Sequence, residues 1–193
     1  MGKRIGIVCV ALGILCLLGA LGLVIYNRWE EAQAARNTEV LLEQVQLAME
    51  EDAPQAEPSA QPAEMATVQV DGYDCIGILS VPALELELPV LTDWSYAKLK
   101  LAPCLYYGAY YEENFVIAAH NYDAHFGRLS QLLPGDRVLF TDVAGRSHSY
   151  EVVLLETLPK EATEEMIASG FDLSLYTCTP GGANRVTVRC RQQ

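Results

Sequence analysis

The sequence predicts a mainly β domain, a barrel or a sandwich of seven to eight short strands, behind an N-terminal membrane helix. Three observations carry this prediction. Residues 5–26 form one apolar block without a charge. From about Thr67 onward, short apolar or alternating runs of strand length follow one another. Turn sequences such as Pro134-Gly135-Asp136 separate those runs.

The apolar block is long enough for a membrane-spanning helix, because about 20 uncharged apolar residues cross a bilayer. Lys3 and Arg4 precede it. A cleaved signal peptide is the alternative, since Ala32-Gln33-Ala34 has the small-x-small form of a cleavage site. The block exceeds the usual core of a signal peptide, roughly 7–15 residues, and the site lies well past its end. We therefore expect an uncleaved, single-pass anchor over residues 1–28.

Residues 29–66 are expected to form a juxtamembrane helix followed by a Pro/Ala-rich linker. The helical composition extends to about residue 52. Residues 53–66 contain three prolines at four-residue spacing among Ala, Gln and Glu. Such a sequence is typical of an extended, semi-stiff linker, which would hold the following domain away from the membrane.

Residues 67–193 form the predicted folded domain. Its expected strands are 75–80, 84–91, 114–120, 137–142, 148–157, 172–178 and 185–191. Helices are expected only at about 94–101 and 160–169.

Charge excludes one class of partner. The chain carries a net charge of −12, and the part after the apolar block has 11 basic and 25 acidic residues, a net −14. Nucleic acid needs clustered basic residues, so we expect no nucleic-acid partner.

The last two predicted strands place a cysteine beside arginines. Successive strand residues point to opposite faces, and the short, Gly-containing TPGGAN connection predicts a hairpin. The expected core set is Leu173, Leu175, Thr177, Val186, Val188 and Cys190. The opposite face then carries Ser174, Tyr176, Cys178, Arg185, Thr187, Arg189 and Arg191. A nearby guanidinium favours the thiolate form of a cysteine, so Cys178 is the candidate nucleophile.

His120 is the candidate acid and base, because it ends the apolar run NFVIAAH and a cysteine nucleophile needs such a partner. Arg189 is the alternative to Arg185 as the functional cation. His125 and His148 are expected at the surface. Among the other cysteines, Cys190 is expected to act as a small buried hydrophobe, whereas Cys75 and Cys104 could pair outside the cell or remain thiols.

Four blocks, in chain order, resemble the sortase family. They are IGILSVPALELELPVL at 76–91, IAAHN at 117–121, FGRLSQLLPGDRVLF at 126–140, and LYTC at 175–178 followed by TPGGANR to Arg185. The resemblance covers about residues 73–191 and is closest to class-B-like sortases of clostridial-type Gram-positive bacteria. It implies a seven- to eight-stranded sortase-type β-barrel. The chain departs from the family pattern at Ala119, where glycine is usual, and in the short segment 158–171.

The resemblance implies a membrane-anchored cysteine transpeptidase with its catalytic domain outside the cell. Cys178 would attack a Leu-Pro-x-Thr-Gly-like sorting signal of a surface protein or pilin and form a thioester. His120 would serve as acid and base, Arg185 would stabilise the oxyanion, and Thr177 would support them. An amine of a peptidoglycan precursor or a pilin lysine would resolve the thioester. No metal or cofactor is required by this chemistry.

Two alternatives remain open from the sequence. The first is an exported cysteine protease or hydrolase that releases its acyl-enzyme to water. The second is a catalytically silent sortase-like module that binds peptide without turnover.

Overall fold

The computed structural model describes residues 2–51 and 65–193, which fall into two compact units, one ending at Gln33 and one spanning Ala34–Gln193. The first unit is the apolar part of helix α1 (Gly2–Glu51). An 18-residue window of this helix has a mean hydropathy of 2.9, and none of its residues is buried against other parts of the described structure. By length and composition, the helix is able to cross a membrane.

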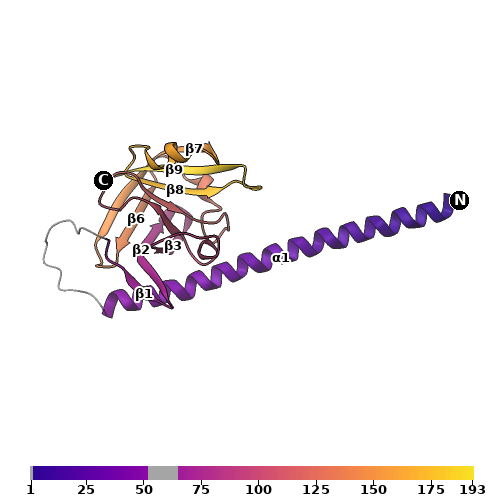
Figure 1. Ribbon diagram of the computed structural model, residues 1–193, viewed down its shortest axis with the longest axis horizontal. Coiled ribbons are helices and arrows are strands. Elements are labelled where there is room, and N and C mark those ends of the chain that lie inside the picture. Colours follow the sequence, from indigo (N-terminus) through magenta and orange to yellow (C-terminus); the bar gives the residue numbers. More distant parts are fainter. Residues whose placement is uncertain (1, 52–64) are drawn as a thin grey trace. The chain divides into compact units, whose positions relative to one another are not determined.

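The second unit contains a sheet that closes into a barrel (Figure 1). Its strands are β1 (Val68–Val70), β2 (Tyr73–Val81), β3 (Leu86–Leu91), β4 (Cys104–Tyr107), β5 (Phe115–Ala118), β6 (Arg137–Asp142), β7 (Ser147–Pro159), β8 (Leu173–Cys178) and β9 (Asn184–Gln192). The strand order is β1-β2-β3-β4-β5-β8-β9-β7-β6, and β2 also pairs with β6. The eight strands from β2 to β9 therefore form a closed ring, which confirms the predicted barrel, and β1 is a short arm paired with β2.

Gly77 permits this closure. It pairs with Val90 of β3 on one side and Asp142 of β6 on the other. A Cβ atom at Gly77 would lie 2.1 Å from the carbonyl oxygen of Thr141, and its φ of +151° is one that other residues rarely adopt. Only glycine lets β2 approach β6 this closely.

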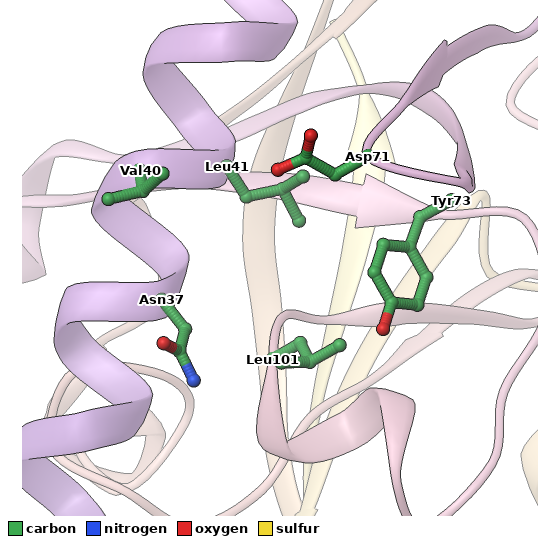
Figure 2. A pocket seen from close by; sticks show the side chains of 6 residues that line it. All are labelled: Asn37, Val40, Leu41, Asp71, Tyr73 and Leu101. Carbon is green, nitrogen blue, oxygen red and sulfur yellow. The ribbon is translucent and has the colours of Figure 1, made fainter.

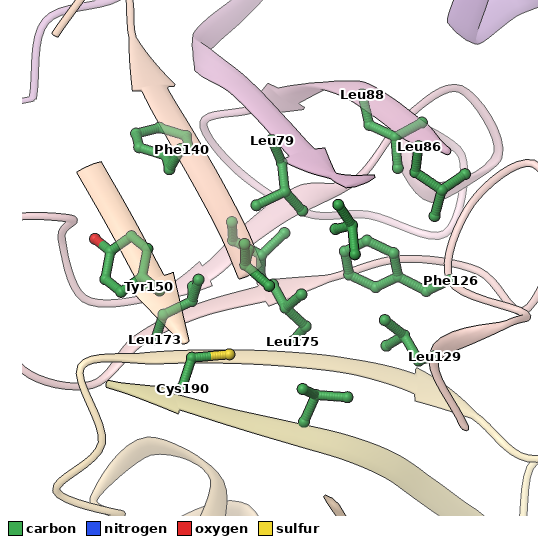
Figure 3. Packing of buried hydrophobic residues seen from close by; sticks show 14 of the residues in the cluster. Leu79, Leu86, Leu88, Phe126, Leu129, Phe140, Tyr150, Leu173, Leu175 and Cys190 are labelled. Atoms are coloured by element: carbon green, nitrogen blue, oxygen red, sulfur yellow. The ribbon is translucent and has the colours of Figure 1, made fainter. Parts of the chain in front are cut away.

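The core fills the inside of the barrel with large apolar side chains (Figure 3). Leu173 and Leu175 of β8, and Val188 and Cys190 of β9, are fully buried there. The predicted alternation of these two strands is therefore confirmed. Burial raises the pKa of the Cys190 thiol to about 12, so this cysteine stays neutral and packs as a hydrophobe.

A second apolar cluster joins the C-terminal part of α1 to the outside of the barrel. Leu41 and Val45 of the helix pack there, and Val45 is fully buried. Their partners on the barrel include Val68, Cys75, Ile78, Leu91, Ala102 and Cys104. Residues 34–51 thus belong to the same compact unit as the strands. Of the expected linker at 53–66, only residues 65 and 66 are among the described residues.

A pocket of about 200 Å³ lies beside this cluster (Figure 2). It is lined by Asn37, Val40 and Leu41 of α1 and by Asp71, Tyr73 and Leu101. None of the predicted catalytic residues lines it.

The structure contains two strands that the sequence did not predict, β1 and β4. Both are short, with three and four residues, so neither shows a convincing alternation. The predicted helices shrink to single turns. The 3₁₀-helix η2 (Lys98–Lys100) replaces 94–101, and α2 (Thr163–Ile167) replaces 160–169. Two further 3₁₀ turns are η1 (Pro82–Leu84) and η3 (Leu129–Gln131).

Candidate functional site

Strand register brings the three predicted catalytic positions into one row. Strand β5 pairs in parallel with β8, with Ala118 opposite Tyr176. Two residues beyond this pair, past the end of the β5–β8 ladder, the two segments reach His120 and Cys178. On the other side, β8 pairs with β9 in antiparallel fashion, with Cys178 opposite Arg185. Neighbouring strands lie about 4.8 Å apart, so the same register continued by two residues would put the backbone of Cys178 between those of His120 and Arg185.

The segments that follow β5 and β8 remain hydrogen-bonded to each other past the end of the β5–β8 ladder. The amide of Ala119 donates to the carbonyl of Tyr176 at 3.2 Å. The Thr177 hydroxyl donates to the carbonyl of Ala119 at 2.8 Å, and Thr177 is buried. Thr177 therefore fixes the segment that leads into His120 against the segment that leads into Cys178.

Cys178 lies half-buried at the end of β8, on the face opposite the core. Tyr176 shares this face. Burial raises the pKa of the Tyr176 phenol, the neighbouring Tyr106 and Cys178 raise it further, and Arg185 lowers it. Cys178 and Arg185 thus both act on the Tyr176 phenol, which stays neutral.

Arg185 is held at the mouth of the β8–β9 hairpin. Its Nη1 donates to the carbonyl oxygens of Gly182 at 3.1 Å and Asn184 at 3.0 Å. Within residues 2–51 and 65–193, its Nε and Nη2 donate no hydrogen bond. A guanidinium has five donors, so this one is oriented by its own loop and still has donors for another group.

Arg189 has a different environment, although it lies on the same face of β9. Only 1% of it is exposed. Its Nε donates to Glu156 at 2.7 Å and its Nη1 to the Ser174 hydroxyl at 2.8 Å. Nη1 and Nη2 also donate to the carbonyl oxygens of Met166 and Glu165 in α2. All three nitrogens are engaged, so Arg189 holds the 158–171 segment on the sheet.

The loop that carries His120 closes on itself. The amide of Phe126 donates to the carbonyl of His120 at 3.1 Å, and the amide of Gly127 donates to the carbonyl of Tyr122 at 2.9 Å. A Cβ atom at Gly127 would lie 2.6 Å from the carbonyl oxygen of Asn121. The ring centroid of Tyr122 lies 5.0 Å from that of His120. The histidine thus leaves β5 on a tight loop.

The predicted surface position of His125 is wrong. This residue is fully buried, and its Nε2 lies 2.7 Å from the hydroxyl of Thr38 in α1. Burial, and secondarily the neighbouring His120, lower the pKa of His125 to about 4. The polar composition of the loop suggested exposure, but the loop closes and the helix covers it. Nothing in the sequence links Thr38 to a residue 87 positions away.

His148 is half-buried instead of exposed. Its ring centroid lies 4.7 Å from that of Tyr110, and its Nε2 lies 3.4 Å from Asp142. Asp142 also accepts from Arg146 at 2.8 Å. This cluster belongs to the β6–β7 hairpin and includes none of the three predicted catalytic residues.

The two buried cysteines on β2 and β4 are thiols. Cys75 and Cys104 are free and buried, and burial raises both pKa values to about 12. Among the described residues, no three His, Cys, Asp or Glu side chains are grouped in a way that could hold a metal ion.

A family model of the sortase domain matches residues 79–193. The chain belongs to the sortase family. The matched region is more than half of the chain and contains His120, Cys178 and Arg185. No curated protein matches the sequence.

Solved sortase structures have the same fold. A Clostridium perfringens sortase D5 transpeptidase gives a TM-score of 0.58 at 18% identity, covering 82% of this chain and 96% of that one. Sortase C of Streptococcus pneumoniae, described with respect to catalysis and pilin substrate specificity, gives 0.55 at 22%, covering 86% and 95%. Clostridium perfringens sortase C with its C-terminal cell wall sorting motif gives 0.57 at 18%, covering 83% and 90%. The class-B-like assignment within the family stays a prediction.

Proposed function

We propose that this sortase is a membrane-anchored cysteine transpeptidase in which Cys178 is the nucleophile, His120 the acid and base, and Arg185 the oxyanion-stabilising cation. The observation that carries the proposal is the row formed by β5, β8 and β9. In that row Cys178 pairs with Arg185 and follows Tyr176 by two residues, just as His120 follows Ala118. A thiol between an imidazole and a guanidinium has both partners that acyl transfer needs.

In the first half-reaction, the Cys178 thiolate attacks the carbonyl carbon of the scissile amide and a carbon–sulfur bond forms. The carbonyl oxygen becomes an oxyanion, towards which the unused Nε and Nη2 donors of Arg185 would point. Protonated His120 gives its proton to the leaving nitrogen as the carbon–nitrogen bond breaks. The products are a thioester on Cys178, a free amine and neutral His120.

In the second half-reaction, an amine attacks the thioester carbon and His120 takes a proton from the attacking nitrogen. The carbon–sulfur bond breaks, a new amide forms, and the thiolate and imidazolium are restored. One amide replaces another, so the exchange is nearly isoenergetic and needs no coupled energy source.

Contacts on β9 favour Arg185 over Arg189 as the cation. Every nitrogen of Arg189 is already engaged with protein groups, and its side chain is buried. Using it in catalysis would break its ion pair with Glu156 and its buried hydrogen bond to Ser174. Thr177 is assigned a supporting role, because its hydroxyl is bonded to Ala119 and not directed to a substrate.

For the substrate, we propose a Leu-Pro-x-Thr-Gly-like sorting signal at the C-terminus of a surface protein or pilin. The acceptor would be an amine of a peptidoglycan precursor or a pilin lysine. Support comes from relatives, since one structure is described with a cell wall sorting motif and another with respect to pilin specificity. The apolar part of α1 would anchor the enzyme, with the barrel on the outer side of the cell membrane.

The test is turnover of sorting peptides by the full chain in detergent micelles, with and without an added amine. We expect cleavage between Thr and Gly, a covalent adduct on Cys178 detectable by mass spectrometry, and an amide product that depends on the amine. Hydrolysis alone at saturating amine would indicate the protease alternative. Binding of the peptide without an adduct would indicate the silent module.

A further inference from the structure

A buried hydrogen bond connects the helix that precedes the barrel to the loop that carries His120. Thr38 of α1 and His125 are both buried, with 4% and 0% of their surfaces exposed. The Thr38 hydroxyl and His125 Nε2 are 2.7 Å apart. Both residues lie in the compact unit Ala34–Gln193.

The geometry assigns the direction of this hydrogen bond. The Thr38 oxygen also lies 2.6 Å from the carbonyl oxygen of Leu101 and 2.9 Å from that of Ala34. Both carbonyls are acceptors only, so the single hydroxyl proton is donated to one of them, and the shorter distance favours Leu101. The hydroxyl oxygen therefore accepts from His125, which carries its proton on Nε2. Nδ1 of His125 is buried and has no hydrogen-bond partner among the described residues, so the contact with Thr38 is what fixes this ring.

His125 is in turn connected to His120. The ring of Tyr122 packs near both histidines, with centroid distances of 5.5 Å to His125 and 5.0 Å to His120. The backbone follows the same path, because the amide of His125 donates to Tyr122 and the amide of Phe126 donates to His120. The series Thr38, His125, Tyr122, His120 is a continuous set of contacts from α1 to the proposed acid and base.

Packing alone does not require this polar pair. Leu41 and Val45 of α1 already provide apolar contacts with the barrel. Burying a hydroxyl and an imidazole costs desolvation energy that an apolar pair would avoid. A directional bond at this position instead fixes the rotation of one ring.

We propose that Thr38 and His125 are positioning residues for His120, so that α1 contributes to the catalytic apparatus through Thr38, whereas its apolar residues only hold the helix on the barrel. The proposal rests on the function proposed above. Loss of the Thr38 hydroxyl would leave the His125 ring without its fixed orientation, and Tyr122 would pass the disorder to His120. Misplacement of an acid–base group lowers the rate of the chemical step more than it weakens substrate binding.

The test uses the full chain in detergent micelles with three variants. Thr38→Val removes the hydroxyl and keeps the shape, and we expect kcat to fall about tenfold to a hundredfold, with KM within about twofold of the wild type. Thr38→Ser keeps the hydroxyl and is expected to restore kcat. Val45→Ala is the control on the same helix face: it removes buried apolar contact without touching His125, and should lower the thermal midpoint with little effect on kcat below that temperature.

A spectroscopic readout separates this inference from the proposed function. In ¹⁵N-histidine-labelled protein we expect a slowly exchanging Nε2 proton on His125, lost in Thr38→Val and kept in Val45→Ala. The His120 ring signals should shift only in Thr38→Val. The inference is overturned if the His120 signals do not respond, or if Thr38→Ser is as slow as Thr38→Val. A wild type that shows these signals but turns over no sorting peptide would contradict the proposed function and leave the contact intact.

Discussion

The outer face of β8 and β9 has two ends that contain similar residues in opposite environments. At the open end, Cys178 is opposite Arg185, both are half-buried, and among the described residues the arginine is bonded only to its own loop. At the closed end, Ser174 is opposite Arg189, which is 1% exposed and bonded through all three nitrogens. The two arginines are four residues apart on one strand.

The difference shows how one strand face can supply both structure and reactivity. A buried guanidinium that donates four hydrogen bonds to protein groups is held away from a substrate, and moving it would leave Glu156 without its cation. A guanidinium at a strand end keeps donors and water access. Coverage by the 158–171 segment, and not residue type, separates the two ends.

The largest effect is expected from the thiol at the open end. Cys178→Ala removes the proposed nucleophile, so turnover of sorting peptides should fall at least about 10⁴-fold. The measurements are peptide cleavage and adduct mass, with Cys190→Ala as the matched control at a buried thiol. Residual turnover within tenfold of the wild type in Cys178→Ala would remove this cysteine from the proposal.

The two arginines should respond in opposite ways. Arg185→Ala is expected to lower kcat by about 10²–10³-fold, because an oxyanion donor is lost, with little change in the free energy of unfolding. Arg189→Met is expected to lower the free energy of unfolding by about 2 kcal/mol, because the Ser174 hydroxyl and the carbonyl oxygen of Met166 lose their buried donor. Urea unfolding and peptide kinetics on the same preparations measure both quantities.

Conservative variants sharpen this contrast. Arg185→Lys keeps the charge but loses the forked donors, and should recover only part of kcat. If Arg189→Met abolished turnover while remaining fully folded, and Arg185→Ala were active, the assignment of the two ends would be reversed.

The sequence was sufficient to predict the two faces of these strands but not their two ends. Alternation placed Leu175 and Val188 inward and Cys178 and Arg185 outward, because a strand fixes the side-chain direction at each residue. The same alternation placed Arg189 outward as well. Arg189 differs from Arg185 because the 158–171 segment folds over it. This is a tertiary contact, which strand alternation cannot predict.

The burial of the residues behind the open end could not be predicted from the sequence either. His125 lies in a polar loop, and its burial depends on Thr38, far away along the chain. The expected spacer character of the segment before the barrel rested on composition. Composition does not reveal that Leu41 and Val45 find a partner surface on β1 to β4.

The loss of folding stability in acid should originate at His125, which lies behind the open end, and not at Arg189 at the closed end. The folded-state pKa of His125 is about 4, below its ordinary 6.5. Between these values the unfolded chain binds a proton that the folded chain does not, so the stability contribution is complete above about pH 6.5 and is lost as the pH falls toward 4. The gap corresponds to about 3 kcal/mol.

Urea unfolding of residues 34–193 at pH 7, 6, 5 and 4 measures this loss. His125→Gln should reduce the decline in unfolding free energy over that range, whereas Arg189→Met should lower all values and keep the decline. An equal decline in His125→Gln and wild type would assign the acid sensitivity to carboxyl groups elsewhere.

The smallest effect is expected from Thr177, which lies between the two ends. Thr177→Val removes the hydrogen bond to the carbonyl of Ala119 and keeps the shape. A buried hydrogen bond contributes about 1 kcal/mol, so a loss of about that size is expected in the free energy of unfolding, with a several-fold decrease in kcat. Thr177→Ser should recover both. Because Thr177 connects the segments that precede His120 and Cys178, a drop in kcat as large as that of Arg185→Ala would mean that its hydroxyl contacts the substrate, and that the open end extends one residue further into β8.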